Sequence, residues 1–276
     1  MRSGLPALLL FLLAAAPVAA QTRPLLTEEA TTAPAGRVLF ETGVDFMANV
    51  PNYVTGRPRS VWAGPLLRLV YSPAGNVELD VEWVARVWAV GVTGSPDVSD
   101  WGDVTLRAKV RLHDGKGKGP TLGARFGVAL PETSYNDREG RPLGLGPNTL
   151  RMFSEALLTQ PLGRAALHLN AGLFIHDEVE RPHAQNDFLS YGLAVTFTLS
   201  PAWEAVAEVS GRTGEGTAGA EARSEARAGV RIGSGHVRGD AAVRRGLLPA
   251  DGKWGAILGL AWAIKPGGGK AAPASP

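Results

Sequence analysis

The 276-residue chain contains no cysteine. This absence excludes a disulfide scaffold, a thiolate zinc site, an iron–sulfur centre and a lipid-modified N-terminal cysteine. The chain also lacks repeated runs of about 18 or more apolar residues, which excludes a helical membrane protein with several spans. Neither sign of charge dominates, with 28 Lys and Arg against 26 Asp and Glu, so there is no global basic footprint for nucleic acid. Glycine, in contrast, is abundant at 35 residues, well above its usual share of ~7%.

The first twenty residues have the three parts of a secretory signal peptide. Arg2 supplies the positive region, residues 7–16 are apolar, and residues 17–20 provide small side chains for cleavage. The apolar stretch is too short to span a bilayer as an uncleaved anchor, which needs about 20 residues. We therefore expect cleavage after Ala20 and, given the lack of cysteine, export to a bacterial envelope.

The rest of the chain alternates between apolar and polar residues with a period of two. From Val77 to Ala89 every odd position is apolar, while the even positions include Glu78, Asp80 and Glu82. Successive side chains of a strand point to opposite faces, so one face is apolar and the other is charged. The apolar positions do not recur at the spacings of three and four that a helix requires. The pattern therefore predicts β-strands.

Twelve such segments can be counted along the chain. Most span ten residues or more, longer than the five or six residues of an average soluble strand and long enough to cross a bilayer when tilted. Their approximate limits are 37–49, 62–72, 76–91, 102–112, 120–130, 149–159, 164–175, 188–199, 202–211, 221–232, 236–246 and 254–265.

The connections between these segments alternate in length. Tight turns such as residues 72–75 and 161–163 alternate with longer loops such as residues 50–61 and 131–148. Bacterial outer-membrane barrels have an even number of strands, short periplasmic turns and long extracellular loops. We therefore predict an all-β fold, a twelve-stranded antiparallel transmembrane β-barrel. The alternative is a soluble β-sandwich or a soluble barrel with a filled lumen, but sandwich strands are shorter and their connections need not alternate.

In a barrel of this kind the charged faces line the lumen. Basic and acidic positions are nearly balanced, and adjacent strands 76–91 and 102–112 oppose an acidic row with a basic row. Such a lining is either a selectivity filter or a plug of mutually neutralising pairs, and the balance of charge favours the plug. The predicted pore-lining residues are Arg68, Glu78, Asp80, Glu82, Arg86, Trp88, Arg107, Lys109, Arg111, Arg125, Arg151, Glu155, His168, Arg223, Glu225, Arg227, Arg231, Arg238, Asp240 and Arg244.

Aromatic residues lie near the predicted strand ends, where a membrane barrel places its two girdles. Trp88 is an exception, because its position predicts that it faces the lumen. The aromatic residues assigned to the long-loop girdle are Trp62, Trp101 and Trp254, and those assigned to the turn girdle are Tyr71, Trp203 and Trp262.

Residues that could carry chemistry are sparse. The five histidines show no metal-ligand spacing, and His168 is interpreted as a hydrogen-bonded lumen residue rather than a catalytic base. The acidic loop around His176 and Asp187 has oxygen ligands for a divalent cation but is more simply a solvated loop. We therefore expect no catalytic residue, no metal, no cofactor and no enzymatic activity.

Several short motifs resemble the outer-membrane family named for the meta-pathway of phenol degradation. The resemblance covers roughly residues 25–265 and implies a twelve-stranded outer-membrane barrel associated with uptake of small, often hydrophobic or aromatic compounds. The motifs are Leu26-Thr27-Glu28-Glu29-Ala30, Ala35-Gly36-Arg37, Gly102-Asp103-Val104-Thr105-Leu106-Arg107-Ala108-Lys109, Ala129-Leu130-Pro131, Gly146-Pro147-Asn148, Leu158-Thr159-Gln160-Pro161-Leu162-Gly163 and His168-Leu169-Asn170-Ala171-Gly172.

The sequence therefore predicts four parts. These are a signal peptide at 1–20, a periplasmic N-terminal extension at 21–36, an outer-membrane barrel at 37–265 and a flexible C-terminal tail at 266–276. The expected function is a monomeric channel in outer-membrane lipid for passive uptake of small solutes, and the alternative is a structural or partner-binding barrel with a charge-plugged lumen. Whether residues 21–35 insert into the barrel and close it is left open by the sequence.

Overall fold

The computed structural model describes residues 22–91, 97–134, 136, 137, 140, 143–178, 181 and 184–264, with the side chain of Ser234 left out. The predicted signal peptide and the predicted C-terminal tail lie outside these residues. Within the described residues, no helix is long and apolar enough to span a membrane.

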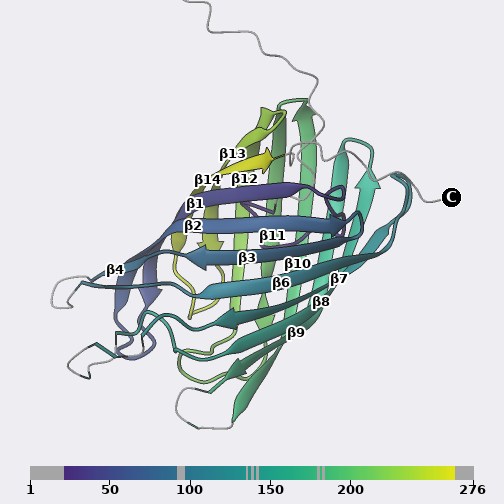
Figure 1. Ribbon diagram of the computed structural model, residues 1–276. Helices are drawn as coiled ribbons and strands as arrows, with labels where there is room; N and C mark the ends of the chain where they lie inside the picture. The colour runs from purple at the N-terminus through teal and green to yellow at the C-terminus, as the bar shows by residue number, and fades with distance from the viewer. Residues whose placement is uncertain are drawn as a thin grey trace, which may run out of the picture.

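The described residues form one antiparallel sheet that closes on itself (Figure 1). Closure occurs at β1, which pairs along its length with β14 on one side and with β2 on the other. The strands are β1 (Val38–Pro51), β2 (Pro58–Ala74), β3 (Val77–Val84), β4 (Val87–Gly91), β5 (Val98–Asp100), β6 (Val104–His113), β7 (Thr121–Leu130), β8 (Arg151–Leu162), β9 (Ala165–Asp177), β10 (Gln185–Ser200), β11 (Trp203–Thr213), β12 (Arg223–Ser234), β13 (Val237–Gly246) and β14 (Trp254–Ile264).

Two of the barrel strands are interrupted. β3 and β4 both pair with β2, and β5 and β6 pair with β4 and β3 in turn, so the fourteen segments make twelve barrel strands. The interruption between β3 and β4 lies opposite Pro65, which has no backbone N–H to donate to the ladder. The predicted twelve-stranded antiparallel barrel is therefore confirmed.

The connections follow the predicted alternation in part. Two-residue turns close β2–β3, β8–β9, β10–β11 and β12–β13 at one end of the barrel. The β6–β7 connection at that end spans residues 114–120 and is one residue longer than the β1–β2 loop, residues 52–57, at the opposite end. Gly163 and Gly235 adopt φ values of 69° and 72° in two of the tight turns, a left-handed conformation that glycine accepts without steric cost.

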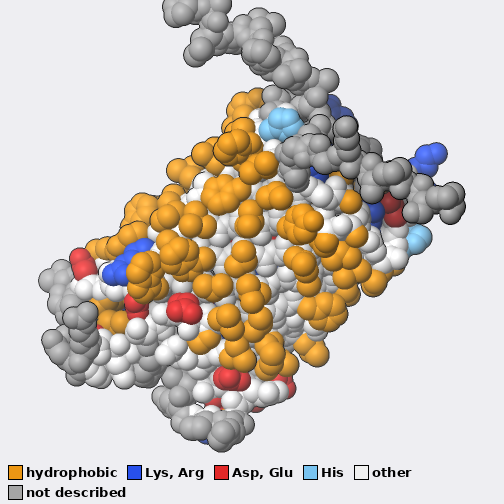
Figure 2. Space-filling model, viewed as in Figure 1, with side chains coloured by type: hydrophobic (Ala, Val, Ile, Leu, Met, Phe, Trp, Pro, Cys, Tyr) orange, Lys and Arg blue, Asp and Glu red, His pale blue; other side chains and the backbone are white. Residues whose placement is uncertain are grey.

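The outer surface carries exposed apolar side chains of the barrel strands, and they form a broad patch on the face shown in Figure 2. Leu173 and Leu258 are each 58% exposed, whereas charged side chains gather at the two ends of the barrel. An apolar belt between charged ends is the surface that a bilayer requires of a membrane barrel. The six girdle aromatics are all exposed on this surface, as predicted: Trp62, Trp101, Trp254, Tyr71, Trp203 and Trp262.

Candidate functional site

Residues 22–33 lie inside the barrel, and we call them the lumen segment. This corrects the prediction of a periplasmic extension at 21–36, because most of these side chains are buried against the inner wall. The segment has unpaired backbone groups that need partners wherever it lies. The inner face of the barrel supplies them, and this gives the segment a physical reason to insert.

Two arginines of β12 hold the start of the lumen segment by its carbonyl groups. Arg231 donates from Nε to the Arg23 carbonyl at 2.7 Å and from a terminal nitrogen to the Thr22 carbonyl at 2.8 Å. Arg227 donates to the Pro24 carbonyl at 2.8 Å. Hydrogen bonds from a charged donor are about twice as strong as neutral ones, so this is a firm attachment.

Carboxylates and a hydroxyl of the wall accept the backbone N–H groups of the same segment. Both oxygens of Glu208 are used, one for the N–H of Leu26 and one for the N–H of Thr27, each at 2.8 Å. Further along, Ala30 N–H donates to Thr159 at 2.9 Å and Ala33 N–H donates to Glu78 at 2.5 Å. The segment is thus bonded on both its donor and its acceptor groups.

Glu28 is the most densely contacted side chain of the lumen segment. Its carboxylate receives Lys109 Nζ at 3.1 Å and Arg125 at 2.9 Å, with Arg68 at 3.6 Å and the Thr22 hydroxyl at 2.8 Å. Burial alone would raise the pKa of the Glu28 carboxyl, but these three cations hold its pKa well below the ordinary value. The Glu28 carboxyl is therefore ionised when the segment occupies the lumen.

Arg23 makes the matching cationic contact on the other side of the lumen. Its guanidinium donates to Asp45 at 3.2 Å and to the Leu258 carbonyl at 3.1 Å, and it lies 3.7 Å from Asp240. Glu29 adds a second carboxylate, 3.6 Å from Arg231, so the segment contributes one positive and two negative charges to the inner network.

Glycines on the inner wall make the space that the lumen segment fills. A Cβ at Gly43 would lie 2.4 Å from the Arg23 guanidinium, and one at Gly259 would lie 2.6 Å from Arg23 Nε. A Cβ at Gly192 would lie 2.6 Å from the hydroxyl of Thr27. Side chains at these positions would collide with the segment. The three glycines therefore form a groove that accommodates the segment, which explains part of the high glycine content of the sequence.

The remaining inner charges form cross-strand pairs. Glu78 of β3 lies opposite Lys109 of β6 with 2.5 Å between Nζ and the carboxylate, and Asp80 lies opposite Arg107 at 2.9 Å. The predicted facing of an acidic row by a basic row is thus present. Predicted residues that contact the lumen segment or another inner side chain are Arg68, Glu78, Asp80, Glu82, Arg107, Lys109, Arg125, Glu155, His168, Glu225, Arg227, Arg231, Arg238, Asp240 and Arg244.

Three further predicted residues lie near the ends of the barrel. Arg111 pairs with Asp114 at the turn side, and Arg151 pairs with Asp103 at the loop side. Arg223 contacts the carboxylate of Glu221 at 3.3 Å, which also belongs to the loop side.

Two predicted lumen residues are placed elsewhere. Trp88 is 41% exposed on the outer surface, because the interruption after Val84 reverses which parity faces inward. Arg86 lies in this interruption, where it donates to Ser99 at 2.7 Å and stacks over the exposed ring of Trp101. Strand alternation cannot show such a reversal, although Pro65 in the neighbouring strand is a signal of it.

The histidines have ordinary structural partners. His168 lies 3.0 Å from the hydroxyl of Thr159 and 3.3 Å from that of Thr196, in agreement with its interpretation as a hydrogen-bonded lumen residue. His176 lies against Thr149 and the Asp177 carbonyl. No group of three or more potential metal ligands occurs in the part of the chain that the structure describes.

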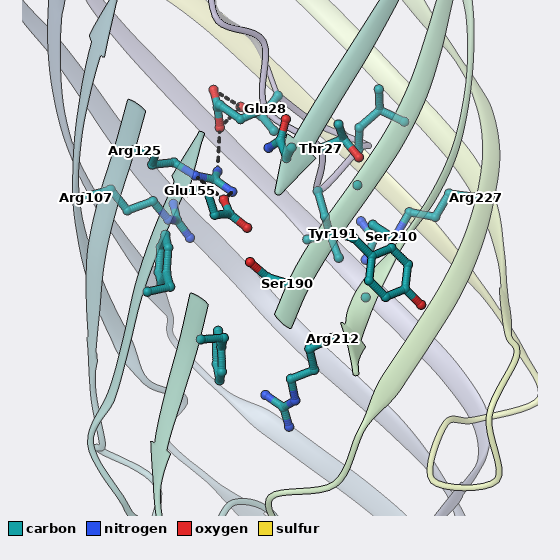
Figure 3. Close-up of a pocket in the computed structure, with 18 of the residues that line it drawn as sticks. Thr27, Glu28, Arg107, Arg125, Glu155, Ser190, Tyr191, Ser210, Arg212 and Arg227 are labelled. Atoms are coloured by element: carbon teal, nitrogen blue, oxygen red, sulfur yellow. Dashed lines mark hydrogen bonds and ion pairs between the residues drawn. The ribbon is translucent and has the colours of Figure 1, made fainter. Parts of the chain in front are cut away.

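A cavity of about 320 Å³ remains between the lumen segment and the long-loop end of the barrel (Figure 3). Thr27 and Glu28 of the segment lie on one side in Figure 3, Arg212 of the wall lies on the other, and Ser190 lies between them; all four line the cavity. Arg212 and the lumen segment were absent from the predicted lining, since the expected strand ended at residue 211 and residues 22–33 show no strand period.

A known protein family matches most of this chain. The model of the family described as "Putative MetA-pathway of phenol degradation" matches residues 23–236. The chain belongs to this family. With its closed wall, polar lumen and apolar belt, this member is a bacterial outer-membrane β-barrel. No curated protein matches the chain.

Solved outer-membrane barrels are similar at low identity. The translocator domain of the autotransporter NalP from Neisseria meningitidis is 14% identical, with a TM-score of 0.47, covering 84% of this chain and 89% of that one. LpxR from Salmonella typhimurium is 9% identical, with a TM-score of 0.48, covering 82% and 99%. The CymD monoaromatic hydrocarbon channel is 10% identical, with a TM-score of 0.43, covering 84% and 89%. These likenesses are too distant to assign a function.

Proposed function

We propose that this protein is a gated outer-membrane channel for passive uptake of small solutes, closed at rest by the lumen segment. The observation that carries the proposal is the chemistry of the seal. The segment is held mainly by hydrogen bonds and ion pairs to the wall, which water can replace when the segment moves. Its clearest apolar contact is the small cluster of Leu25 with Ala194 and Val206.

The shape of the wall supports the same proposal. Glycines at Gly43, Gly192 and Gly259 leave a groove for the segment instead of side chains that would fill the lumen permanently. A barrel with a fixed core closes its interior with wall side chains alone, as small eight-stranded barrels do. A separate insert leaves an aqueous path behind it once it is displaced.

The second candidate is a structural or partner-binding barrel whose lumen stays sealed. One observation favours it: the ion pairs run from strand to strand, with Glu204 joining Arg231 at 2.9 Å to Arg238 at 3.1 Å. Pairs of this kind would remain on the inner wall after the segment has moved and would keep the lumen narrow. In that case displacement of the segment would not produce conductance.

Planar-bilayer recording of the refolded protein with and without Glu28→Gln separates the two candidates. The neutral amide leaves Lys109, Arg68 and Arg125 around a site without a negative charge, and removing one partner of a buried ion pair costs about 3–5 kcal/mol. We expect rare openings in the unsubstituted protein and openings at least ten times more frequent in the variant.

Glu215→Gln is the matched control, because Glu215 is an exposed loop residue and its substitution should leave the openings unchanged. Heat-modifiable migration of each variant shows that its barrel has formed. Folded variants that never conduct, Glu28→Gln included, would contradict a channel and favour the sealed barrel.

A further inference from the structure

The cavity beside the lumen segment is lined by residues of ten barrel strands and of the segment itself. At about 320 Å³ it falls within the range of roughly 300–1,000 Å³ that small-molecule sites occupy. Glu155 of β8 and Ser190 of β10 both line it, and each pairs in the sheet register with Gly172 of β9 between them.

An aromatic row lies on the long-loop side of the cavity, with Phe153 and Phe174 in its lining and Phe188 buried next to Phe174. Phe153, Phe174 and Phe188 are register partners on β8, β9 and β10. The rings of Phe153 and Phe174 are nearly parallel with centroids 6.3 Å apart, and Phe188 meets Phe174 edge to face at 6.5 Å. Such a row is a contact surface for a flat, apolar molecule.

Three buried hydroxyl groups beside the cavity have no hydrogen-bond partner. They belong to Thr27, which is 3% exposed, Ser190, which is 5% exposed, and Ser210, which is 4% exposed. All three line the cavity, and Thr27 sits over Gly192, the register partner of Ser210. A buried hydroxyl without a partner destabilises the fold, so three in one place point to a polar ligand that satisfies them.

Arg212 supplies an unmatched positive charge at the same place. It is the register partner of Ser190, its Nε donates to the Glu221 carbonyl at 2.9 Å, and its guanidinium lies over the rings of Phe174 and Phe188 at 4.8 and 5.1 Å. Among the described residues no carboxylate forms an ion pair with it. Seven arginines but only four carboxylates line the cavity as a whole, so the balance found in the rest of the lumen is broken here.

We propose that this cavity is a binding site for an organic monocarboxylate with a flat apolar body. The carboxylate lies between the Arg212 guanidinium and the hydroxyls of Ser190, Ser210 and Thr27, and the apolar body packs on the aromatic row. As a statement about transport, the inference rests on the proposed channel function. As a statement about binding, it needs no passage through the barrel.

Equilibrium binding of benzoate to the full-length protein in detergent micelles tests the proposal, with isotope-labelled benzoate as the probe. We expect saturable binding that weakens at least tenfold in Arg212→Gln and about threefold to tenfold in Ser210→Ala. Benzyl alcohol, which keeps the ring without the charge, and acetate, which keeps the charge without the ring, should each bind at least tenfold more weakly than benzoate.

Arg164→Gln is the matched control. Arg164 also stacks on a phenylalanine, Phe197, at 5.5 Å, but it lies exposed at the turn end of the barrel. Its substitution should leave benzoate binding unchanged. Absence of saturable benzoate binding, or equal binding by unsubstituted protein and Arg212→Gln, overturns the proposal. Because the assay measures no flux, its failure is distinct from a failure of the channel proposal.

Discussion

Glu28 shows how much of this site depends on a single side chain. It meets cations from three strands, Lys109 of β6, Arg125 of β7 and Arg68 of β2, which are far apart in the sequence. No periodicity marks residue 28, and its nearest sequence neighbours read as an ordinary polar extension. A sequence pattern reports which face of a strand is charged, but it does not report that a carboxylate from outside the strands will join that face.

The low pKa of Glu28 predicts how the seal responds to acid. The Glu28 carboxyl has a pKa of about 4.3 in an unfolded chain, and its pKa is lower when the segment occupies the lumen. The ionised carboxylate therefore stabilises the closed state fully at any pH above about 4.3. This stabilisation is lost only as the pH falls below about 4.3 toward the lower pKa of the closed state. Opening frequency in planar bilayers should therefore be constant between pH 8 and pH 5, and a transition centred between pH 5 and pH 7 would contradict this assignment.

Among the elements, the strands were predictable and their interruption was not. Alternation located all twelve barrel strands because each has one face toward lipid and one toward the lumen. The parity reversal at Arg86 and Trp88 depends on Pro65 in the neighbouring strand, a relation that becomes visible only when the strands are paired. The lumen segment escaped prediction for a similar reason, since the glycines that make room for it come from strands distant in sequence.

The glycine groove gives a prediction at this level. In Gly259→Ala the new Cβ would lie 2.6 Å from Arg23 Nε and from Asp240, which forces Arg23 out of its seat. We expect more frequent openings in bilayer recordings, with the barrel still folded. Gly239→Ala on the neighbouring strand is the control, because its nearest atoms are 3.7 Å away. Equal opening frequencies in the two variants would show that the groove does not hold the segment.

At the level of the whole molecule, closure of the sheet and the apolar belt require a lipid surrounding. We expect the protein in the outer-membrane fraction, with faster electrophoretic migration before heating than after it. We also propose that it is a monomer, so cross-linking in detergent should leave a single-chain band. Recovery in the soluble fraction without heat-modifiable migration would contradict the membrane barrel.

The central claim is that the lumen segment closes the barrel, and a disulfide tests it most directly. A Cβ at Gly192 would lie 3.3 Å from that of Thr27, close to the ~3.5–4.5 Å of a disulfide, and the chain has no other cysteine to compete. The measurement is planar-bilayer conductance of the Thr27→Cys, Gly192→Cys double variant before and after reduction, with each single variant as a control. We predict no conductance while the disulfide is intact and channel openings after reduction; equal conductance in both states would contradict closure by the lumen segment.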